Sequence, residues 1–208
     1  MTNARFITLE GGEGAGKTTA AEHVTQWLES RGRKVVRTRE PGGTAAAEKV
    51  RDLLLDPATG ELEPMTELLL MFAARAENLA RIIRPALAAG HDVLCDRFTD
   101  ASRAYQGGGR GLGMQVVDRV AGIVHPDLQP DLTLLLDVPV AVGLARIQQR
   151  GGQADRFERS RVDFMERMRA TYLARARMEP ERIVLIDASQ PLPAVREAID
   201  HALELRLK

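Results

Sequence analysis

The sequence has little cysteine and no long apolar run. Cys95 is the only cysteine among the 208 residues, so no disulfide can form within the chain. It lies in the apolar run Val93-Leu94-Cys95, which favours a small core residue over a nucleophile. No stretch is long enough to span a bilayer, and the N-terminus lacks the charged-then-apolar pattern of a signal peptide. We therefore expect a soluble, cytoplasmic protein that makes no membrane contact.

A surplus of charge is absent as well. The 29 basic and 29 acidic residues cancel, which argues against nucleic acid and membrane surfaces as partners. Only four of the basic residues are lysine, so arginine dominates. Two explanations of this bias stay open: the base composition of the genome, or a phosphate-rich site, because a guanidinium group binds phosphate through two parallel hydrogen bonds. Histidine is scarce too, and none of the four histidines lies in a motif described below.

One motif organises the chain. Residues 11–18 read G-G-E-G-A-G-K-T, which fits G-x-x-x-x-G-K-[ST], between a strand-like run at 5–9 and helical spacing that starts at Lys17. In this context the glycines let successive backbone N–H groups point at phosphate oxygens, next to the positive end of a helix. Lys17 is expected to reach the β- and γ-phosphates of ATP, and the Thr18 hydroxyl to bind Mg²⁺. The predicted ATP-binding residues of this loop are Gly11, Gly12, Glu13, Gly14, Ala15, Gly16, Lys17, Thr18 and Thr19.

Apolar runs alternate with helical patterns through the rest of the chain. Further strands are predicted at 34–38, 92–96, 132–137 and 183–187, each followed by helical spacing. Strands separated by helices predict right-handed βαβ units, and hence an α/β fold with a five-stranded parallel sheet and helices on both faces. With 44% hydrophobic residues, the chain is most simply one domain over 1–208.

Two helical patterns carry further expectations. The long pattern from 65 to 89 contains Pro85, which is expected to kink or divide the helix. The last pattern, 192–207, has apolar residues on one side, which indicates packing rather than chemistry.

Polar motifs follow two of the predicted strands. The second strand leads into Arg39-Glu40-Pro41-Gly42-Gly43-Thr44 and the third into Asp96-Arg97-Phe98. Each motif alone fits a simple turn equally well, but ligands of parallel sheets bind beyond the carboxyl ends of the strands, where both would meet the phosphate loop. Asp96 and Asp137 compete as the acidic group that supports Mg²⁺. We favour Asp96, because Arg97 beside it supplies a phosphate partner.

Three further features accompany these motifs: the acidic Glu13 inside the loop, Phe72 with Arg75, and Ala104-Tyr105-Gln106-Gly107-Gly108-Gly109-Arg110. Together, the motifs and these features resemble bacterial thymidylate kinases. The resemblance covers nearly the whole chain, in order. It implies a P-loop nucleoside-monophosphate-kinase fold that usually forms homodimers. It also implies transfer of the γ-phosphoryl group of Mg²⁺-bound ATP to dTMP, giving dTDP for dTTP synthesis.

The resemblance also implies roles for single residues. Phe72 would stack on thymine, Arg75 would bond to its carbonyl, and a group of polar residues would lie near the base edge. Arg97, assisted by Arg39, would grip the dTMP phosphate, and Glu13 would approach the sugar 3′-hydroxyl or the metal shell. The expected group near the base is Ser102, Tyr105 and Gln106.

A lid is expected at about 146–161. This segment holds five arginines around Gly151-Gly152, a pattern that charge alone would equally assign to a solvated helix end. Members of the resembling family that lack a basic residue inside the phosphate loop carry a catalytic arginine in the lid, and this loop has none. The resemblance therefore implies that Arg150 is the leading transition-state arginine, with Arg146 and Arg156 as further candidates at ATP. With Lys17, Arg97 and Glu13, Arg150 completes the predicted catalytic set.

Several alternatives stay open. Spacing alone places Phe72 in a core-facing stripe with Leu68, Leu69 and Leu79, and reads Asp100 with Arg103 as an exposed helix salt bridge. The phosphate loop does not choose the base, so a kinase for another nucleoside monophosphate fits it too. A P-loop ATPase or switch protein is the alternative of a different class, although no N-K-x-D motif is present. The phosphate of a nucleoside monophosphate, with a second pKa of about 6, is itself an anionic nucleophile, so the predicted transfer requires no protein base.

Overall fold

The computed structural model describes residues 4–149 and 158–207, and for residues 158–161 it describes the backbone alone. Five strands form one parallel sheet in the order β2-β3-β1-β4-β5. The strands are β1 (Phe6–Glu10), β2 (Val35–Arg39), β3 (Asp92–Asp96), β4 (Leu132–Asp137) and β5 (Ile183–Asp187). The predicted α/β fold is thus confirmed, and three of the five predicted strands have the observed bounds. The first two lie one residue further along the chain than expected.

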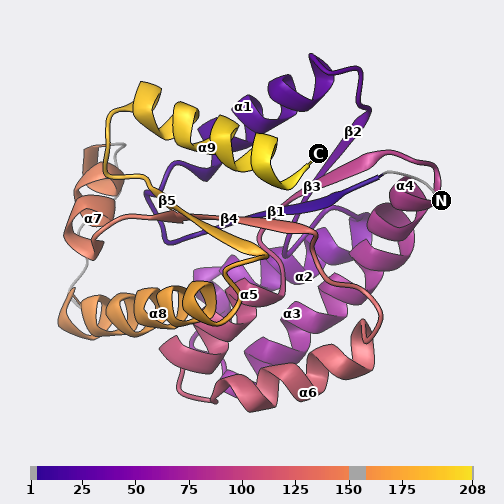
Figure 1. Cartoon of the computed structure of the whole chain (residues 1–208). Helices are drawn as coiled ribbons and strands as arrows, with labels where there is room; N and C mark the ends of the chain where they lie inside the picture. Colours follow the sequence, from indigo (N-terminus) through magenta and orange to yellow (C-terminus); the bar gives the residue numbers. More distant parts are fainter. Residues whose placement is uncertain (1–3, 150–157, 208) are drawn as a thin grey trace.

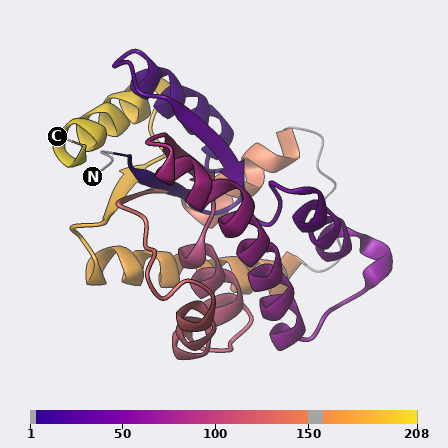
Figure 2. The same cartoon turned by 90° about the vertical axis from the view of Figure 1, so that its right-hand side faces the viewer.

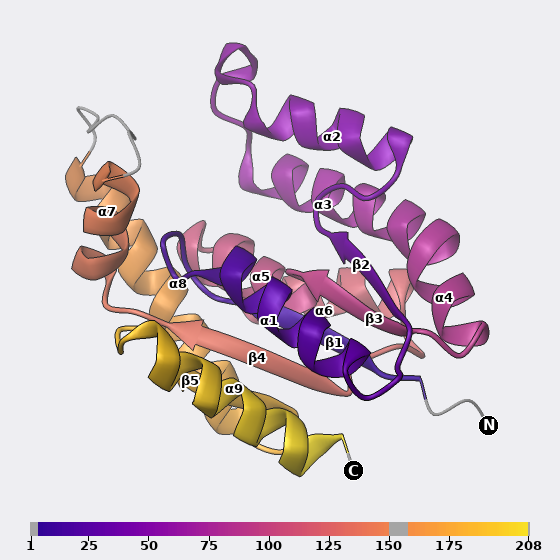
Figure 3. The ribbon, with the colours of Figure 1, turned by 90° about the horizontal axis from the view of Figure 1, so that it is seen from above.

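Helices cover both faces of the sheet (Figure 1). One face carries α1 (Lys17–Glu29) and α9 (Leu192–Arg206), which lie side by side in the view from above (Figure 3). Along β1 successive side chains alternate between the faces, so Ile7 packs in the cluster that includes Val24 and Leu203, while Phe6 packs with Ile83 on the other face. The expected packing role of the last helix is therefore confirmed.

The other face carries the helices that follow β2 and β3, together with α8 (Glu158–Met178). At the margin of the molecule, α2 (Ala45–Leu55) packs against α3 (Pro64–Asn78), as the turned view shows (Figure 2). The remaining helical segments are the 3₁₀ turn Pro57–Thr59, α4 (Arg84–Ala88), α5 (Thr99–Ser102), α6 (Met114–Val124) and α7 (Val140–Gln149).

Two helices contain π-helical segments. The first, Leu79–Ile83, separates α3 from α4 within one continuous helical run, and Pro85 follows it directly, so the widened turn lies where the proline interrupts the regular hydrogen bonds. The second, Arg103–Gly109, continues α5 and carries the predicted residues Tyr105 and Gln106. Within the two described ranges, no helix combines the length and the apolar character needed to cross a membrane.

Candidate active site

The phosphate loop joins β1 to α1, as its motif predicts. Gly11, Gly14 and Gly16 have φ values of 136°, 73° and 87°, a backbone region that side-chain-bearing residues rarely adopt. Lys17 folds back over the loop, and its Nζ atom donates to the carbonyl oxygens of Gly11 and Gly12, both at 3.0 Å. Burial, followed by the nearby Arg97 guanidinium, lowers the pKa of Lys17 to about 8. The loop and its lysine are therefore held in one defined arrangement.

Helix α7 contacts this loop backbone to backbone. A Cβ atom placed on Gly143 would lie 2.7 Å from the carbonyl oxygen of Glu13, so only glycine fits there without a shift. One turn further on, Nη1 of Arg146 donates to the carbonyl oxygens of Ala188 at 2.9 Å and Gly14 at 3.3 Å. The predicted residue Arg146 thus lies directly against the loop.

A hollow of about 190 Å³ opens next to Arg146. It is bordered by the loop on one side, and on the other by Gln190 of the turn from β5 into α9 and by Arg196 of α9. The sequence carried no signal for this turn, because its polar residues form no motif and are exposed.

A second hollow, of about 370 Å³, lies on another side of α1 and borders Thr18, Arg39 and Asp96. Arg97 lies close by, and its Nη2 atom donates to the Tyr105 hydroxyl at 3.0 Å. Arg39 is half-exposed and paired with Glu48 at 2.9 Å.

Arg51 is a third arginine of this region, and sequence reasoning missed it. Its Nη1 atom donates to the Pro41 carbonyl at 3.0 Å. Burial first, and then the positive charges of Arg39 and Arg97, lower the pKa of Arg51, although the Glu48 charge opposes this, so the three arginines lie close enough to repel one another. Such a cluster of like charges is suited to an anion, which would relieve its repulsion.

Arg75 of α3 is fully buried next to the turn that follows β2. Its Nε atom donates to Oε2 of Glu40 at 2.6 Å, and its Nη2 atom to the Ser102 hydroxyl at 3.1 Å. Asn78 donates to the other Glu40 oxygen at 3.2 Å. Burial raises the pKa of Glu40, although the Arg75 charge opposes this. Glu40 therefore fixes the predicted base-binding arginine, a role that its place in a turn motif did not reveal.

Phe72 has the packing of a core residue. Its side chain is buried with Leu68, Val117 and Ala121, and the Arg75 guanidinium lies 4.3 Å from its ring centroid. Leu69, a member of the predicted apolar stripe, is 53% exposed and points elsewhere. The assignment of Phe72 to a base remains a prediction.

His125 supports Phe72 from behind, although no motif marked it. Its ring stacks on Phe72 with centroids 6.2 Å apart, and its Nε2 atom shares a hydrogen bond of 2.9 Å with the Thr99 hydroxyl. Burial, followed by the Arg75 charge, lowers the pKa of His125 to about 4. The folded protein thus holds this imidazole neutral at neutral pH.

The His125 pKa predicts an acid-sensitive stability. Between pH 6.5 and 4 the unfolded chain binds a proton at His125 that the folded chain refuses, so the free energy of unfolding should fall as pH falls through this window, by about 3 kcal/mol at most. In urea titrations at several pH values, His125→Gln should flatten this slope, whereas the same change at the exposed His201 should leave it unchanged. Equal slopes for wild type and His125→Gln would contradict the prediction.

Unpaired polar atoms gather at the same place. Among the described residues, four of the six buried side-chain polar atoms without a hydrogen-bond partner belong to predicted site residues. Buried polar atoms are normally paired, so these four are suited to the polar groups of a ligand. They are Nη1 of Arg75, Oδ1 of Asp96, Nε of Arg97 and Oε1 of Gln106.

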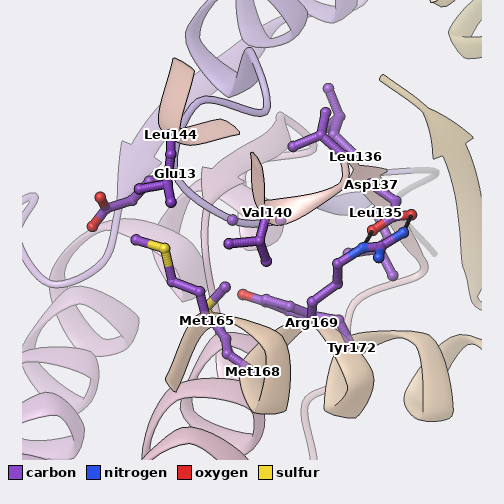
Figure 4. Close-up of a pocket in the computed structure, with 13 residues that line it drawn as sticks. Glu13, Leu135, Leu136, Asp137, Val140, Leu144, Met165, Met168, Arg169 and Tyr172 are labelled. Carbon is purple, nitrogen blue, oxygen red and sulfur yellow. Dashed lines mark hydrogen bonds and ion pairs between the residues drawn. The ribbon is translucent and has the colours of Figure 1, made fainter. Parts of the chain in front are cut away.

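The two competing aspartates differ in their partners. Asp137 accepts two hydrogen bonds of 2.8 Å from Arg169 of α8, whereas Oδ1 of Asp96 is buried and unpaired beside Thr18. Figure 4 shows the Asp137–Arg169 pair at the edge of a small cavity behind the loop, with Met165, Met168 and Val140 around it. This cavity of about 20 Å³ has room for one water molecule but not for a nucleotide. The geometry therefore favours Asp96 as the acidic group of the site.

The expected exposed salt bridge of Asp100 and Arg103 is wrong in one respect. The two residues do pair, at 2.9 Å, but both are buried. Arg182 at 2.7 Å and Arg175 at 3.3 Å also contact the Asp100 carboxylate. Helical spacing shows the neighbours within one helix, but it cannot show that Arg175 of α8 and Arg182, just before β5, cover them. Of the predicted lid, Arg150 and Arg156 lie outside the described residues.

The site thus has two sides. The phosphate loop offers backbone N–H groups and Lys17 to one set of phosphates, and the arginine cluster across Thr18 and Asp96 offers a place for a second anion. A parallel sheet that carries a phosphate loop and a second anion site at the carboxyl ends of its strands is typical of P-loop phosphotransferases of the nucleoside-monophosphate-kinase class.

Comparison with known proteins gives the particular family. The family model for thymidylate kinase matches residues 9–199. Thymidylate kinase of Chromohalobacter salexigens is 57% identical over 208 residues, which are 100% of this chain and 98% of the relative. Thymidylate kinase of Pseudomonas putida strain W619 is 57% identical over 198 residues, 95% of each chain. The chain belongs to the thymidylate kinase family, which confirms the family and the enzyme class expected from the motifs.

Proposed function

We propose that the chain transfers the γ-phosphoryl group of ATP to dTMP, giving ADP and dTDP. The observation that carries this proposal is the grouping of Arg39, Arg51 and Arg97 near a hollow lined by Thr18, Arg39 and Asp96, with unpaired buried polar atoms of Asp96 and Arg97 beside it. An ATPase without an acceptor would have no need of this second anion site.

The donor side would bind ATP. Backbone N–H groups of the loop and the Lys17 ammonium would hold its β- and γ-phosphates, and the hollow beside Arg146 and Gln190 would take the adenine. Thr18 and the unpaired Oδ1 of Asp96 offer the oxygen ligands that Mg²⁺ takes from a protein when phosphates complete its shell. When bound there, Mg²⁺ would neutralise charge on the phosphates.

The acceptor side would bind dTMP. Arg39, Arg51 and Arg97 would hold its phosphate, with Glu13 toward the sugar or the metal shell. Phe72 and Arg75 would take the thymine. Ser102, Tyr105 and Gln106 border the same region, and Glu67 fixes Gln106 through a hydrogen bond of 2.7 Å.

The transfer would need no protein base. A phosphate oxygen of dTMP forms the new bond to the γ-phosphorus, and the bond from that phosphorus to the β,γ-bridging oxygen breaks, so ADP leaves. The enzyme would bring the two anions into line and offset their repulsion. Arg150 is proposed as the leading transition-state arginine, and Arg146 and Arg156 are the further candidates.

An ATP-consumption assay with Mg²⁺ tests the proposal. We expect a high rate with dTMP, and low rates with dCMP, AMP, GMP or no acceptor. A missing methyl group discriminates by only about 10- to 200-fold, so dUMP is expected to be a weak substrate. Equal turnover without an acceptor would favour the ATPase or switch class and remove the base-pocket assignments.

The contact between α7 and the loop predicts a defect confined to the donor. The Cβ atom of Gly143→Ala would press on the Glu13 carbonyl and displace the loop. Overpacking of this kind costs about 1–3 kcal/mol, so we expect KM for ATP to rise about tenfold while KM for dTMP holds. Gly122→Ala in α6 is the matched control, because a Cβ atom there meets nothing within 4 Å. An unchanged KM for ATP in Gly143→Ala would contradict the prediction, because the loop would then accommodate the added methyl group without weaker ATP binding.

We also propose that the chain forms a homodimer through α3 and α6. These helices contact each other, and they carry Leu69 and Ile123, which are 53% and 82% exposed. Large apolar side chains on adjoining helices gain free energy when a second copy covers them. Light scattering should give twice the monomer mass for wild type, and a single-chain mass for Ile123→Glu. A monomeric wild type would contradict the proposal.

A further inference from the structure

Glu10 is a buried carboxyl group that the transfer described above does not use. It ends β1, directly before the phosphate loop, and is 0% exposed. Its Oε1 atom accepts the backbone N–H of Phe98, and its Oε2 atom accepts the Tyr172 hydroxyl, both at 2.7 Å. Acidic side chains are almost never fully buried unless they are paired. These two hydrogen bonds therefore indicate which groups the Glu10 side chain supports.

The first hydrogen bond closes an unusual turn. Where β3 ends, Arg97 still donates its N–H to the Leu9 carbonyl at 2.9 Å, in register with β1. Its φ of 71° then turns the chain out of the sheet, and Arg97 is the one non-glycine residue with positive φ in the described part of the chain. This left-handed conformation costs about 1–2 kcal/mol for a residue with a side chain. The next N–H, that of Phe98, consequently meets the Glu10 side chain rather than a backbone carbonyl.

The second hydrogen bond anchors Glu10 itself. Tyr172 lies on α8 and is buried, and its hydroxyl holds the carboxyl group in place on the face of the sheet that α8 covers. The tip of Arg97 is held separately, by the Tyr105 hydroxyl at 3.0 Å. The backbone and the tip of Arg97 thus have different hydrogen-bond partners, and Glu10 supports the backbone through the N–H of Phe98.

We propose that Glu10 is a positioning residue that fixes the left-handed turn at Arg97 and so aims this arginine at the acceptor phosphate. The inference rests on the proposed function of Arg97. Glu10 does not touch the substrate. Its loss should therefore weaken binding of the phosphate group and leave binding of the nucleoside unchanged.

Calorimetric titrations with dTMP and with thymidine distinguish binding of the phosphate group from binding of the nucleoside, because thymidine has the same base and sugar without the phosphate. Glu10→Leu removes the acceptor and should lower dTMP affinity by about tenfold or more, with thymidine within about twofold of wild type. Glu10→Gln should restore dTMP affinity to within about threefold, because its amide oxygen can still accept the Phe98 N–H. Thr8→Val is the matched control: it removes a buried hydroxyl of the same strand, bonded to Thr133 at 2.7 Å, and should alter neither affinity.

Tyr172→Phe tests the same point without changing Glu10. It removes only the second hydrogen bond and should lower dTMP affinity about three- to tenfold, again without an effect on thymidine. It decides the question if Glu10→Leu does not fold. An equal loss for both ligands, or none for either, would overturn the inference. A wild-type protein that neither binds nor phosphorylates dTMP would instead overturn the proposed function, so the two failures are distinguishable.

Discussion

Replacing Lys17 by methionine should lower kcat by about 10²- to 10³-fold, the loss typical of one preorganised donor at a developing charge. The ammonium group is already aimed into the phosphate loop by its hydrogen bonds to Gly11 and Gly12. Lys17→Arg should not restore the rate, because the planar guanidinium cannot act as the compact point charge that this buried position holds. Steady-state rates at saturating ATP and dTMP give the measurement.

The same variant should keep its stability. Burial holds the pKa of Lys17 below its ordinary value, so the charged lysine is disfavoured in the fold, and methionine removes that cost. We expect the Tm of Lys17→Met to hold or rise. Lys49→Met, at an exposed position of α2, is the control and should change neither rate nor Tm. A kcat within tenfold of wild type in Lys17→Met would contradict the role of this side chain.

The sheet could be predicted because buried parallel strands read as apolar runs and the phosphate loop fixes where the first one ends. The carboxyl ends then followed from topology, and with them the meeting of Arg39, Asp96 and Arg97. The π-helical segments could not be predicted, since a single widened turn leaves the spacing of apolar residues nearly intact.

The supporting partners of the site were beyond sequence reasoning. Glu40 lies 35 residues from Arg75, and Glu10 lies 88 residues from Phe98, so no local pattern joins them. Arg51 falls on the polar side of an ordinary helix, and only the fold brings it near Arg39 and Arg97. His125 was passed over because it belongs to no motif. The residues predicted to contact a ligand are grouped in sequence motifs. The residues that support them come from distant parts of the sequence.

The buried pair of Arg75 and Glu40 predicts the largest loss of stability. Both side chains are at most 1% exposed, so Arg75→Leu would leave the Glu40 carboxylate buried with only Asn78 as a partner. Breaking a buried ion pair from one side costs about 3–5 kcal/mol in the free energy of unfolding. Arg84→Leu is the control: it breaks an exposed ion pair with Asp127 and should change stability little.

The pH dependence of this loss distinguishes a stranded charge from lost packing. Burial already raises the pKa of Glu40, and removal of the Arg75 cation would raise it further. The folded variant would therefore retain a proton that the unfolded chain releases, so its stability should be greatest below the ordinary carboxyl pKa and fall as pH rises toward the raised value. Glu40→Gln, added to Arg75→Leu, should recover much of the loss at pH 8 and little at pH 5. If the unfolding midpoint of Arg75→Leu in urea were the same at both pH values, the destabilisation would come from packing alone. In wild type the Arg75 charge opposes the rise in the pKa of Glu40, and the Glu40 carboxyl group in turn holds Arg75 in place through a hydrogen bond of 2.6 Å. This mutual support leaves one guanidinium nitrogen of Arg75 unpaired and available to a ligand.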